Sequence, residues 1–158
     1  MVEMHYQRIR DLREDNDLTQ RELATKLGVK RSTYAMWELG DTNFPIEKLA
    51  IVAEIYKTNI EYLLGLSYDK SPMTYYEKDI DYNFIASNLK KSRLRLRKTQ
   101  KEFANTLGVY QSSYSYYEDG QIRIPTDKLI KLATTYHISI NKLCGGTIKK
   151  KDLHYLFQ

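Results

Sequence analysis

Residues 19–29 read TQRELATKLGV and residues 99–109 read TQKEFANTLGV, so one stretch occurs twice with an offset of 80 residues. When this offset is kept, about 20 of the 58 positions from residue 8 to residue 65 are identical in residues 88–145. Most of the other apolar positions stay apolar. A repeat of this length indicates two copies of one structural unit. We therefore predict two small domains, each of about 60 residues, in this chain of 158 residues.

Helix signals surround the repeated stretch. Thr19 followed three residues later by Glu22 is a capping box, which predicts a helix from residue 19 to residue 27. Gly28 then supplies the left-handed turn that commonly ends a helix. Apolar spacing and further stop signals predict five helices without strands in the first copy. The first helix ends within residues 14–17, and the second and third lie at residues 19–27 and 32–39. The fourth has Pro45 in its first turn and reaches residue 56, and the fifth lies at residues 60–64. The second copy predicts helices at residues 85–89, 99–107, 111–119, 125–136 and 140–143.

The expected fold class is all-α, with two tandem five-helix domains. We place the first domain at residues 1–66, a linker at 67–81, the second domain at 82–145 and a basic and apolar tail at 146–158. The linker is rich in tyrosine and polar residues and shows no sustained period, although it could hold a short docking turn. If extended, 15 residues would reach about 50 Å. Leu153, Leu156 and Phe157 in the tail suit a short helix packed on a domain or on a partner.

The charge is unevenly distributed between the two copies. Residues 1–66 hold nine Lys and Arg against eleven Asp and Glu, whereas residues 82–145 hold eleven against four. A polyanion would therefore be attracted first to the second copy.

Several function classes have no support in the sequence. No apolar run approaches the roughly 18 residues that a membrane span needs, and the N-terminal stretch does not resemble a secretory signal, so we expect a cytoplasmic protein. Cys144 is the single cysteine and suits a small buried thiol. His5, His137 and His154 are scattered without partners at ligand spacing. We expect no metal, no cofactor and no enzymatic activity.

The two copies resemble the Cro and phage-repressor type of helix-turn-helix domain. The residues that carry this resemblance are TQ-x-E-[LF]-A-x-x-LGV, followed by S-[TS]-Y-x-x-[WY]-E-x-G and then a proline. The resemblance covers about 60 residues in each copy. It implies that the third helix of each copy enters the major groove of DNA while the second lies across the backbone. It also implies a structural salt bridge between Arg13 and Glu38, and another between Arg93 and Glu118.

The resemblance further implies which residues meet DNA. Near the start of the third helices and one turn later, the expected base readers are Lys30, Arg31, Ser32 and Met36 in the first copy and Tyr110, Gln111, Ser112 and Tyr116 in the second. Arg31 suits the two acceptors of guanine, and Gln111 suits the donor and acceptor of adenine. The expected residues of the second helices, beside phosphate, are Gln20, Arg21, Gln100 and Lys101.

Some of these residues have a second interpretation. We expect core packing rather than base stacking for Tyr34, Tyr114, Trp37 and Tyr117, and DNA contact rather than mere exposure for Tyr116. Met36 fits a contact with a thymine methyl group and a protein interface equally well.

The edge formed by the end of the first helix and the start of the second differs between the copies. In the second copy it carries Lys90, Lys91, Arg95, Arg97, Lys98 and Lys101, and we expect it to lie along phosphates. In the first copy it carries Asp11, Glu14, Asp15 and Asp17, which would repel phosphate.

We therefore expect a transcriptional regulator, a repressor, that binds double-stranded DNA with the second copy as its main anchor. The alternative is a protein-interaction module, such as an antitoxin, anti-repressor or inhibitor, whose acidic first copy binds a protein partner. A homodimer through the tail or linker would also be possible, and it would lengthen the DNA site.

Overall fold

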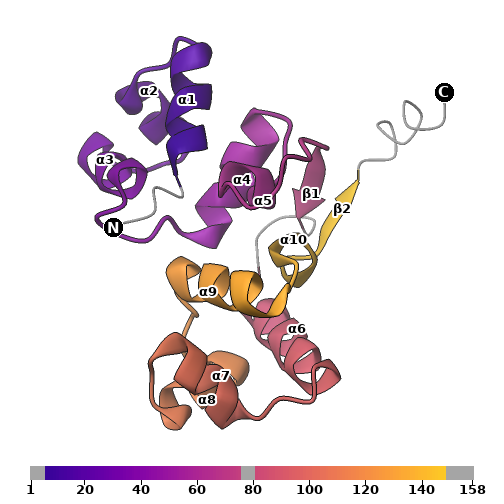
Figure 1. The fold of residues 1–158 in the computed structure, drawn as a ribbon. Helices are drawn as coiled ribbons and strands as arrows, with labels where there is room; N and C mark the ends of the chain where they lie inside the picture. Colours follow the sequence, from indigo (N-terminus) through magenta and orange to yellow (C-terminus); the bar gives the residue numbers. More distant parts are fainter. Residues whose placement is uncertain (1–5, 76–80, 149–158) are drawn as a thin grey trace, which may run out of the picture. The chain divides into compact units, whose positions relative to one another are not determined.

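A computed structural model of the chain describes residues 6–75 and 81–148 (Figure 1). It divides into two compact units, one within residues 1–74 and 147–158 and the other at Tyr75–Gly146. The tail helix expected around Leu153, Leu156 and Phe157 lies outside the described residues.

The first repeat has the five helices that the sequence predicts. They are α1 (Gln7–Asp15), α2 (Gln20–Lys26), α3 (Arg31–Leu39), α4 (Ile46–Ile55) and α5 (Ile60–Leu63). Pro45 is the N-cap of α4 and precedes the first turn by one residue, where its fixed φ still leads into the helix. The core of this repeat includes an aromatic cluster in which Tyr6, Tyr34 and Trp37 surround Phe44, with ring centroids 5.1–6.1 Å from it.

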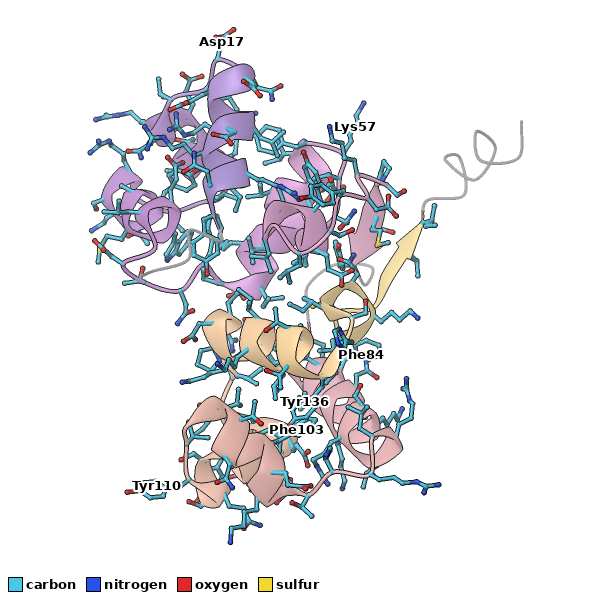
Figure 2. The ribbon with its side chains drawn as sticks, viewed as in Figure 1. Asp17, Lys57, Phe84, Phe103, Tyr110 and Tyr136 are labelled. Atoms are coloured by element: carbon cyan, nitrogen blue, oxygen red, sulfur yellow. The ribbon has the colours of Figure 1, made fainter. Side chains whose placement is uncertain are left out.

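The second repeat has the same order of helices. They are α6 (Tyr82–Arg95), α7 (Gln100–Leu107), α8 (Gln111–Glu118), α9 (Thr126–Tyr136) and α10 (Ile140–Leu143). Ile124 replaces Phe44 at the equivalent position, and the aromatic cluster lies elsewhere in the core. Phe103 and Tyr136 both lie in the second repeat (Figure 2). Their rings stack with centroids 4.6 Å apart, and Phe103 meets Tyr114 edge-on.

Two short strands are an element that the sequence did not predict. β1 (Met73–Tyr75) falls in the expected linker and β2 (Gly146–Ile148) in the expected tail, and the two form a two-stranded sheet. The Thr74 and Thr147 hydroxyls lie 3.3 Å apart across it. The expectation of five helices without strands is therefore right for each repeat, and the two strands lie in the segments that flank the second one.

The expected linker is also bound to the first repeat over much of its length. The side-chain amide of Asn59 donates to the carbonyl oxygens of Asp69 and Ser71, at 2.8 and 3.0 Å, and the amide of Met73 donates to Thr58 O at 3.2 Å. The Arg8 guanidinium donates to Ser67 O. These contacts hold residues 67–73 of the expected linker against the first repeat, so that stretch is not a free extended spacer.

Candidate nucleic-acid interface

The pair α2 and α3 forms a helix, a tight turn and a second helix. The Thr19 hydroxyl accepts from the amide of Glu22 at 3.1 Å and the Glu22 carboxylate accepts from the amide of Thr19, which confirms the capping box. Gly28 has a φ of +71°, a conformation that strains any residue with a Cβ, and it turns the chain toward α3. The same arrangement recurs in α7 and α8, with Thr99, Glu102 and Gly108 in the equivalent places.

All eight residues expected to read bases have exposed side chains. Arg31, Ser32 and Met36 lie on α3 and Gln111, Ser112 and Tyr116 on α8, and Lys30 and Tyr110 are the N-caps of these helices. Tyr110 is 84% exposed and projects away from the body of its repeat (Figure 2). Each helix therefore offers its first turn and one further residue to a ligand.

The opposite side of each helix is buried. Tyr34 and Tyr114 have no exposed surface, and Trp37 is 8% exposed, so the prediction that these rings pack in the core is confirmed. Tyr117 is half-buried and packs edge-on against Tyr114 at 6.4 Å.

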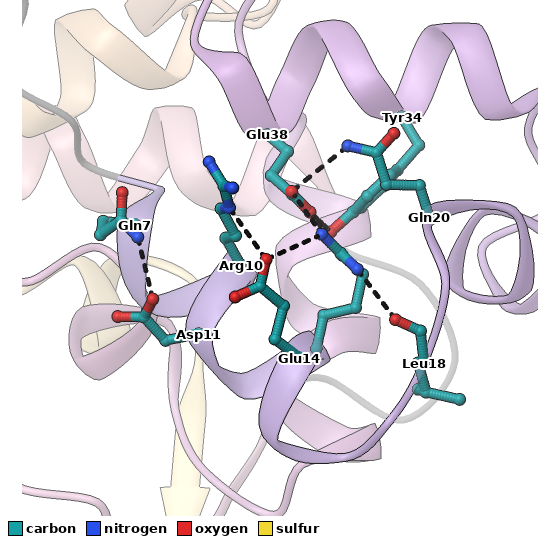
Figure 3. A network of polar contacts seen from close by, with 9 residues as sticks. Gln7, Arg10, Asp11, Glu14, Leu18, Gln20, Tyr34 and Glu38 are labelled. Carbon is teal, nitrogen blue, oxygen red and sulfur yellow. Dashed lines mark hydrogen bonds and ion pairs between the residues drawn. The ribbon is translucent and has the colours of Figure 1, made fainter.

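A buried ion pair ties α3 to α1 in the first repeat (Figure 3). Arg13 donates through Nε and Nη2 to the two carboxylate oxygens of Glu38, both at 2.9 Å, and through Nη1 to Leu18 O at 2.8 Å. In the second repeat Arg93 makes the same contacts with Glu118 and Lys98 O. Both salt bridges implied by the resemblance are therefore confirmed, and each fixes the helix that carries the expected base readers.

The sequence did not predict two further contacts of these glutamates. The hydroxyls of Tyr34 and Tyr114 donate to Glu38 and Glu118, one helical turn away. Burial, followed by this hydrogen bond, raises the pKa of both tyrosines above the ordinary range. The signal was present in the sequence, because tyrosine and glutamate keep the spacing i, i+4 in both copies.

Gln20 and Gln100 begin α2 and α7, as predicted, but each side-chain amide already donates one hydrogen bond within its own repeat. The Nε2 atom of Gln20 donates to Glu38 at 3.3 Å, and that of Gln100 donates to Glu118 at 3.0 Å. An amide nitrogen carries two hydrogens, so one remains for a phosphate oxygen. A contact of either glutamine with DNA stays a prediction.

The two edges differ in charge as expected. In the second repeat, Lys90, Lys91 and Lys101 are exposed and Lys98 is half-buried. In the first repeat, Asp11, Glu14, Asp15 and Asp17 are all exposed, with Glu14 paired to Arg10 at 3.1 Å. The side chain of Arg21, the remaining expected phosphate contact of the first repeat, is also exposed.

The buried glutamates give the fold a dependence on pH. Burial by itself would raise the pKa of Glu38, but hydrogen bonds from Arg13, Tyr34 and Gln20 outweigh it and hold the pKa below the ordinary value; the pKa of Glu118 is lowered in the same way. A carboxyl with a lowered pKa in the folded state stabilises the fold above its unfolded pKa of about 4.3, and this stability is lost as the pH falls through the folded pKa.

We expect the melting temperature to fall as the pH drops below about 4 because Glu38 and Glu118 must then be protonated. Trp37 is the single tryptophan, so its fluorescence follows the first repeat. The Glu38→Gln variant has no charge at residue 38 at any pH. Its melting temperature, followed by Trp37 fluorescence, should therefore fall less with decreasing pH than that of the parent chain. Equal pH dependence in both proteins would contradict the assignment.

Residues 6–75 and 81–148 hold no group of three or more His, Cys, Asp or Glu side chains that could bind a metal ion. Within the same residues, no helix has the length and apolar character to cross a membrane. Cys144 is 1% exposed, as predicted.

Comparisons with known proteins agree with this geometry. A helix-turn-helix family model matches residues 9–63 and 89–143. The chain is 30% identical over 131 residues to the uncharacterized HTH-type transcriptional regulator YobD of Bacillus subtilis. The aligned region covers 83% of this chain and 96% of that protein. It is also 36% identical over 61 residues to the cryptic phage CTXphi transcriptional repressor RstR of Vibrio cholerae, covering 39% of this chain and 54% of that protein. Two matches in tandem, each running from within the first helix of a repeat to the end of its fifth, show that the chain belongs to the helix-turn-helix family of the Cro and phage-repressor type.

Proposed function

We propose that this protein is a transcriptional repressor that binds double-stranded DNA in a sequence-specific way. The observation that carries the proposal is the pair of helices α3 and α8. Each exposes its expected base readers while a buried ion pair holds its other side. A slim exposed helix of this kind fits the major groove, where each base pair has its own pattern of donors and acceptors. Relatives named as a transcriptional regulator and a phage repressor support the regulatory role.

The two helices would read different bases. Arg31 and Lys30 give α3 two cations at its start, whereas Gln111 and Tyr110 give α8 an amide and a phenol. An unlike pair of readers in one chain favours a DNA site without internal symmetry. A dimer formed through the tail or linker would bind a longer site that is symmetric overall.

The second repeat would be the main anchor on DNA. Lys90, Lys91, Lys98 and Lys101 lie along its edge, and the N-terminus of α7 adds partial positive charge there. The acidic edge of the first repeat disfavours phosphate, so that repeat would contribute a weaker half-site or bind a protein partner. As a DNA-binding protein, the chain would act in the cytoplasm.

The test is selection of binding sites from a random duplex library with the full chain and two matched variants. Gln111→Ala should lose about 1–3 kcal/mol of preference at one base position while its binding to unrelated duplexes stays nearly unchanged, because the amide contacts a base edge. Arg31→Ala should lose its preference at a different position. A uniform loss of affinity across all sequences would contradict the role of Gln111. An unchanged site for Arg31→Ala would mean that the first repeat does not read DNA.

A further inference from the structure

The second repeat contains a pocket that takes no part in the base-reading helices. It has a volume of about 260 Å³ and lies between the C-terminal half of α6 and the turn from α9 to α10. One face of α6 contributes Asn88, Lys91 and Arg95, and the turn and α10 contribute His137, Ser139 and Lys142. No residue of α7 or α8 lines it. It is therefore a separate candidate site.

The charge in this pocket is of one sign. Lys91, Arg95 and Lys142 line it, and no Asp or Glu does. None of these three side chains has an ion pair with another described residue. The buried Glu118 is already bound by Arg93, and Glu102 caps α7, so neither carboxylate neutralises the pocket. Cations gathered around a concave surface concentrate a positive potential there, which attracts small anions.

The walls of the pocket are held in place by contacts of their own. Asn88 Nδ2 donates to Leu143 O at 3.1 Å and joins α6 to α10. The Ser139 hydroxyl caps α10 by accepting from the amide of Lys142 at 3.2 Å. The Tyr136 ring is fixed by its stack on Phe103 and by a contact of 2.6 Å between its hydroxyl and that of Thr106. A preformed site of this kind loses little conformational freedom when a ligand binds.

The first repeat provides an internal comparison. With the offset of 80 residues, Asp11, Asp15 and Tyr62 stand where the second repeat has Lys91, Arg95 and Lys142. Arg8 stands where the second repeat has Asn88. Its guanidinium lies 4.3 Å from the centroid of the Tyr62 ring and donates to Tyr62 O at 2.7 Å. In the first repeat the cation of Arg8 thus lies against Tyr62 and the equivalent positions are acidic, whereas the second repeat has an open pocket lined by cations.

We propose that this pocket binds a small organic anion that carries a phosphate or carboxylate group. The anionic group would lie between Lys91, Arg95 and Lys142, and the hydroxyl of Ser92 can donate to it. Leu96, Tyr136 and Leu143 supply an apolar wall for the remainder of the ligand. Such a ligand would act on the second repeat independently of which DNA sequence the protein reads.

The test uses the full chain labelled with ¹⁵N, without DNA, at constant ionic strength. Inorganic phosphate and phenyl phosphate are titrated separately while the amide signals are followed. We expect the shifts to concentrate at Ser92, Ser139 and Lys142, and phenyl phosphate to bind several-fold more tightly than phosphate because its ring meets the apolar wall. In the variant Arg95→Glu with Lys142→Glu, affinity for phenyl phosphate should fall at least tenfold. Lys131→Glu, a single charge reversal on the exposed side of α9, should change it less than twofold.

Three results would overturn the proposal. The first is the absence of localised shifts with either probe. The second is an equal loss of affinity in Lys131→Glu, which would mean that only the overall charge matters. The third is a set of pocket shifts that arises with a DNA duplex but with neither probe, which would assign these cations to the DNA backbone. The neutral variant Arg95→Gln with Lys142→Gln repeats the titration with less disturbance to the fold.

Discussion

The variant Glu38→Ala should unfold the first repeat under conditions in which the second stays folded. Removing the carboxylate leaves Arg13, which is 9% exposed, with only the solvent-exposed Glu14 at 3.8 Å as a charge partner, and it leaves the Tyr34 hydroxyl without an acceptor. Breaking a buried pair from one side costs about 3–5 kcal/mol. A domain of about 70 residues has a total stability of only about 4–10 kcal/mol. The loss is therefore of the same order as the stability of the whole repeat.

Trp37 makes this expectation measurable for one repeat at a time. It is the single tryptophan and lies on α3, where its ring centroid is 5.1 Å from that of Phe44. When its fluorescence is followed in a urea titration of Glu38→Ala, the midpoint should lie at a much lower urea concentration than in the parent chain, or no folded baseline should be present. Amide signals of α7 and α8 in the same sample should remain dispersed.

Two control variants separate the buried pair from general effects. Glu14→Ala removes an exposed carboxylate that pairs with Arg10 at 3.1 Å and with Arg13 at 3.8 Å. Because Arg13 keeps both of its hydrogen bonds to Glu38, this change should alter stability by less than about 1 kcal/mol. Glu118→Ala removes the equivalent buried carboxylate of the second repeat and should leave the Trp37 transition in place. A loss below about 1 kcal/mol in Glu38→Ala would contradict the role of the network. An equal shift of the Trp37 midpoint in Glu118→Ala would contradict independent unfolding.

Sequence reasoning succeeded where the determinants are local. The capping boxes at Thr19 and Thr99 and the turns at Gly28 and Gly108 depend on residues within a few positions of one another. Because the sequence unit occurs twice, the signals for each helix could be compared between the two copies. The burial of Tyr34 followed from its place on the apolar side of a helix.

The features that the sequence did not predict depend on contacts over long separations. β1 and β2 are three residues each and pair across some 70 positions, so neither carries a periodic signal of its own. The binding of the linker rests on the side chain of Asn59 and on backbone carbonyls, which no composition pattern marks. The run of basic residues near Lys91 suggested only a phosphate edge. Its role in a pocket emerges once the turn after α9 brings Lys142 and Ser139 beside α6.

Neutralising the basic edge of the second repeat should weaken binding to every duplex and flatten its dependence on salt. The variant changes Lys90, Lys98 and Lys101 to Gln and leaves Lys91 intact, because Lys91 also lines the pocket of the second repeat. Each lysine that neutralises a phosphate releases about 0.9 counterions, so the slope of log K against log salt should decrease by about 2.7. Between 50 and 200 mM salt, the parent chain would then lose about 40-fold more affinity than the variant. Fluorescence anisotropy with a labelled duplex of unrelated sequence gives both quantities.

Variants of other charged residues decide whether the effect belongs to this edge. Lys131→Gln removes an exposed charge on α9, away from the basic edge, and should leave the slope nearly unchanged. An unchanged slope in the triple variant would contradict a contact between this edge and phosphate.

The first repeat offers the converse test of unequal anchoring. In Asp11→Asn with Asp15→Asn, two exposed carboxylates are lost from the edge that corresponds to the basic one. If only the second repeat lies along DNA, this change should leave the slope as it is, because charges beyond about 8–10 Å from the phosphates are screened at these salt concentrations. A clear gain in affinity would show instead that the acidic edge approaches the backbone. In that case the acidic side chains would limit the contribution of the first repeat rather than exclude it from DNA.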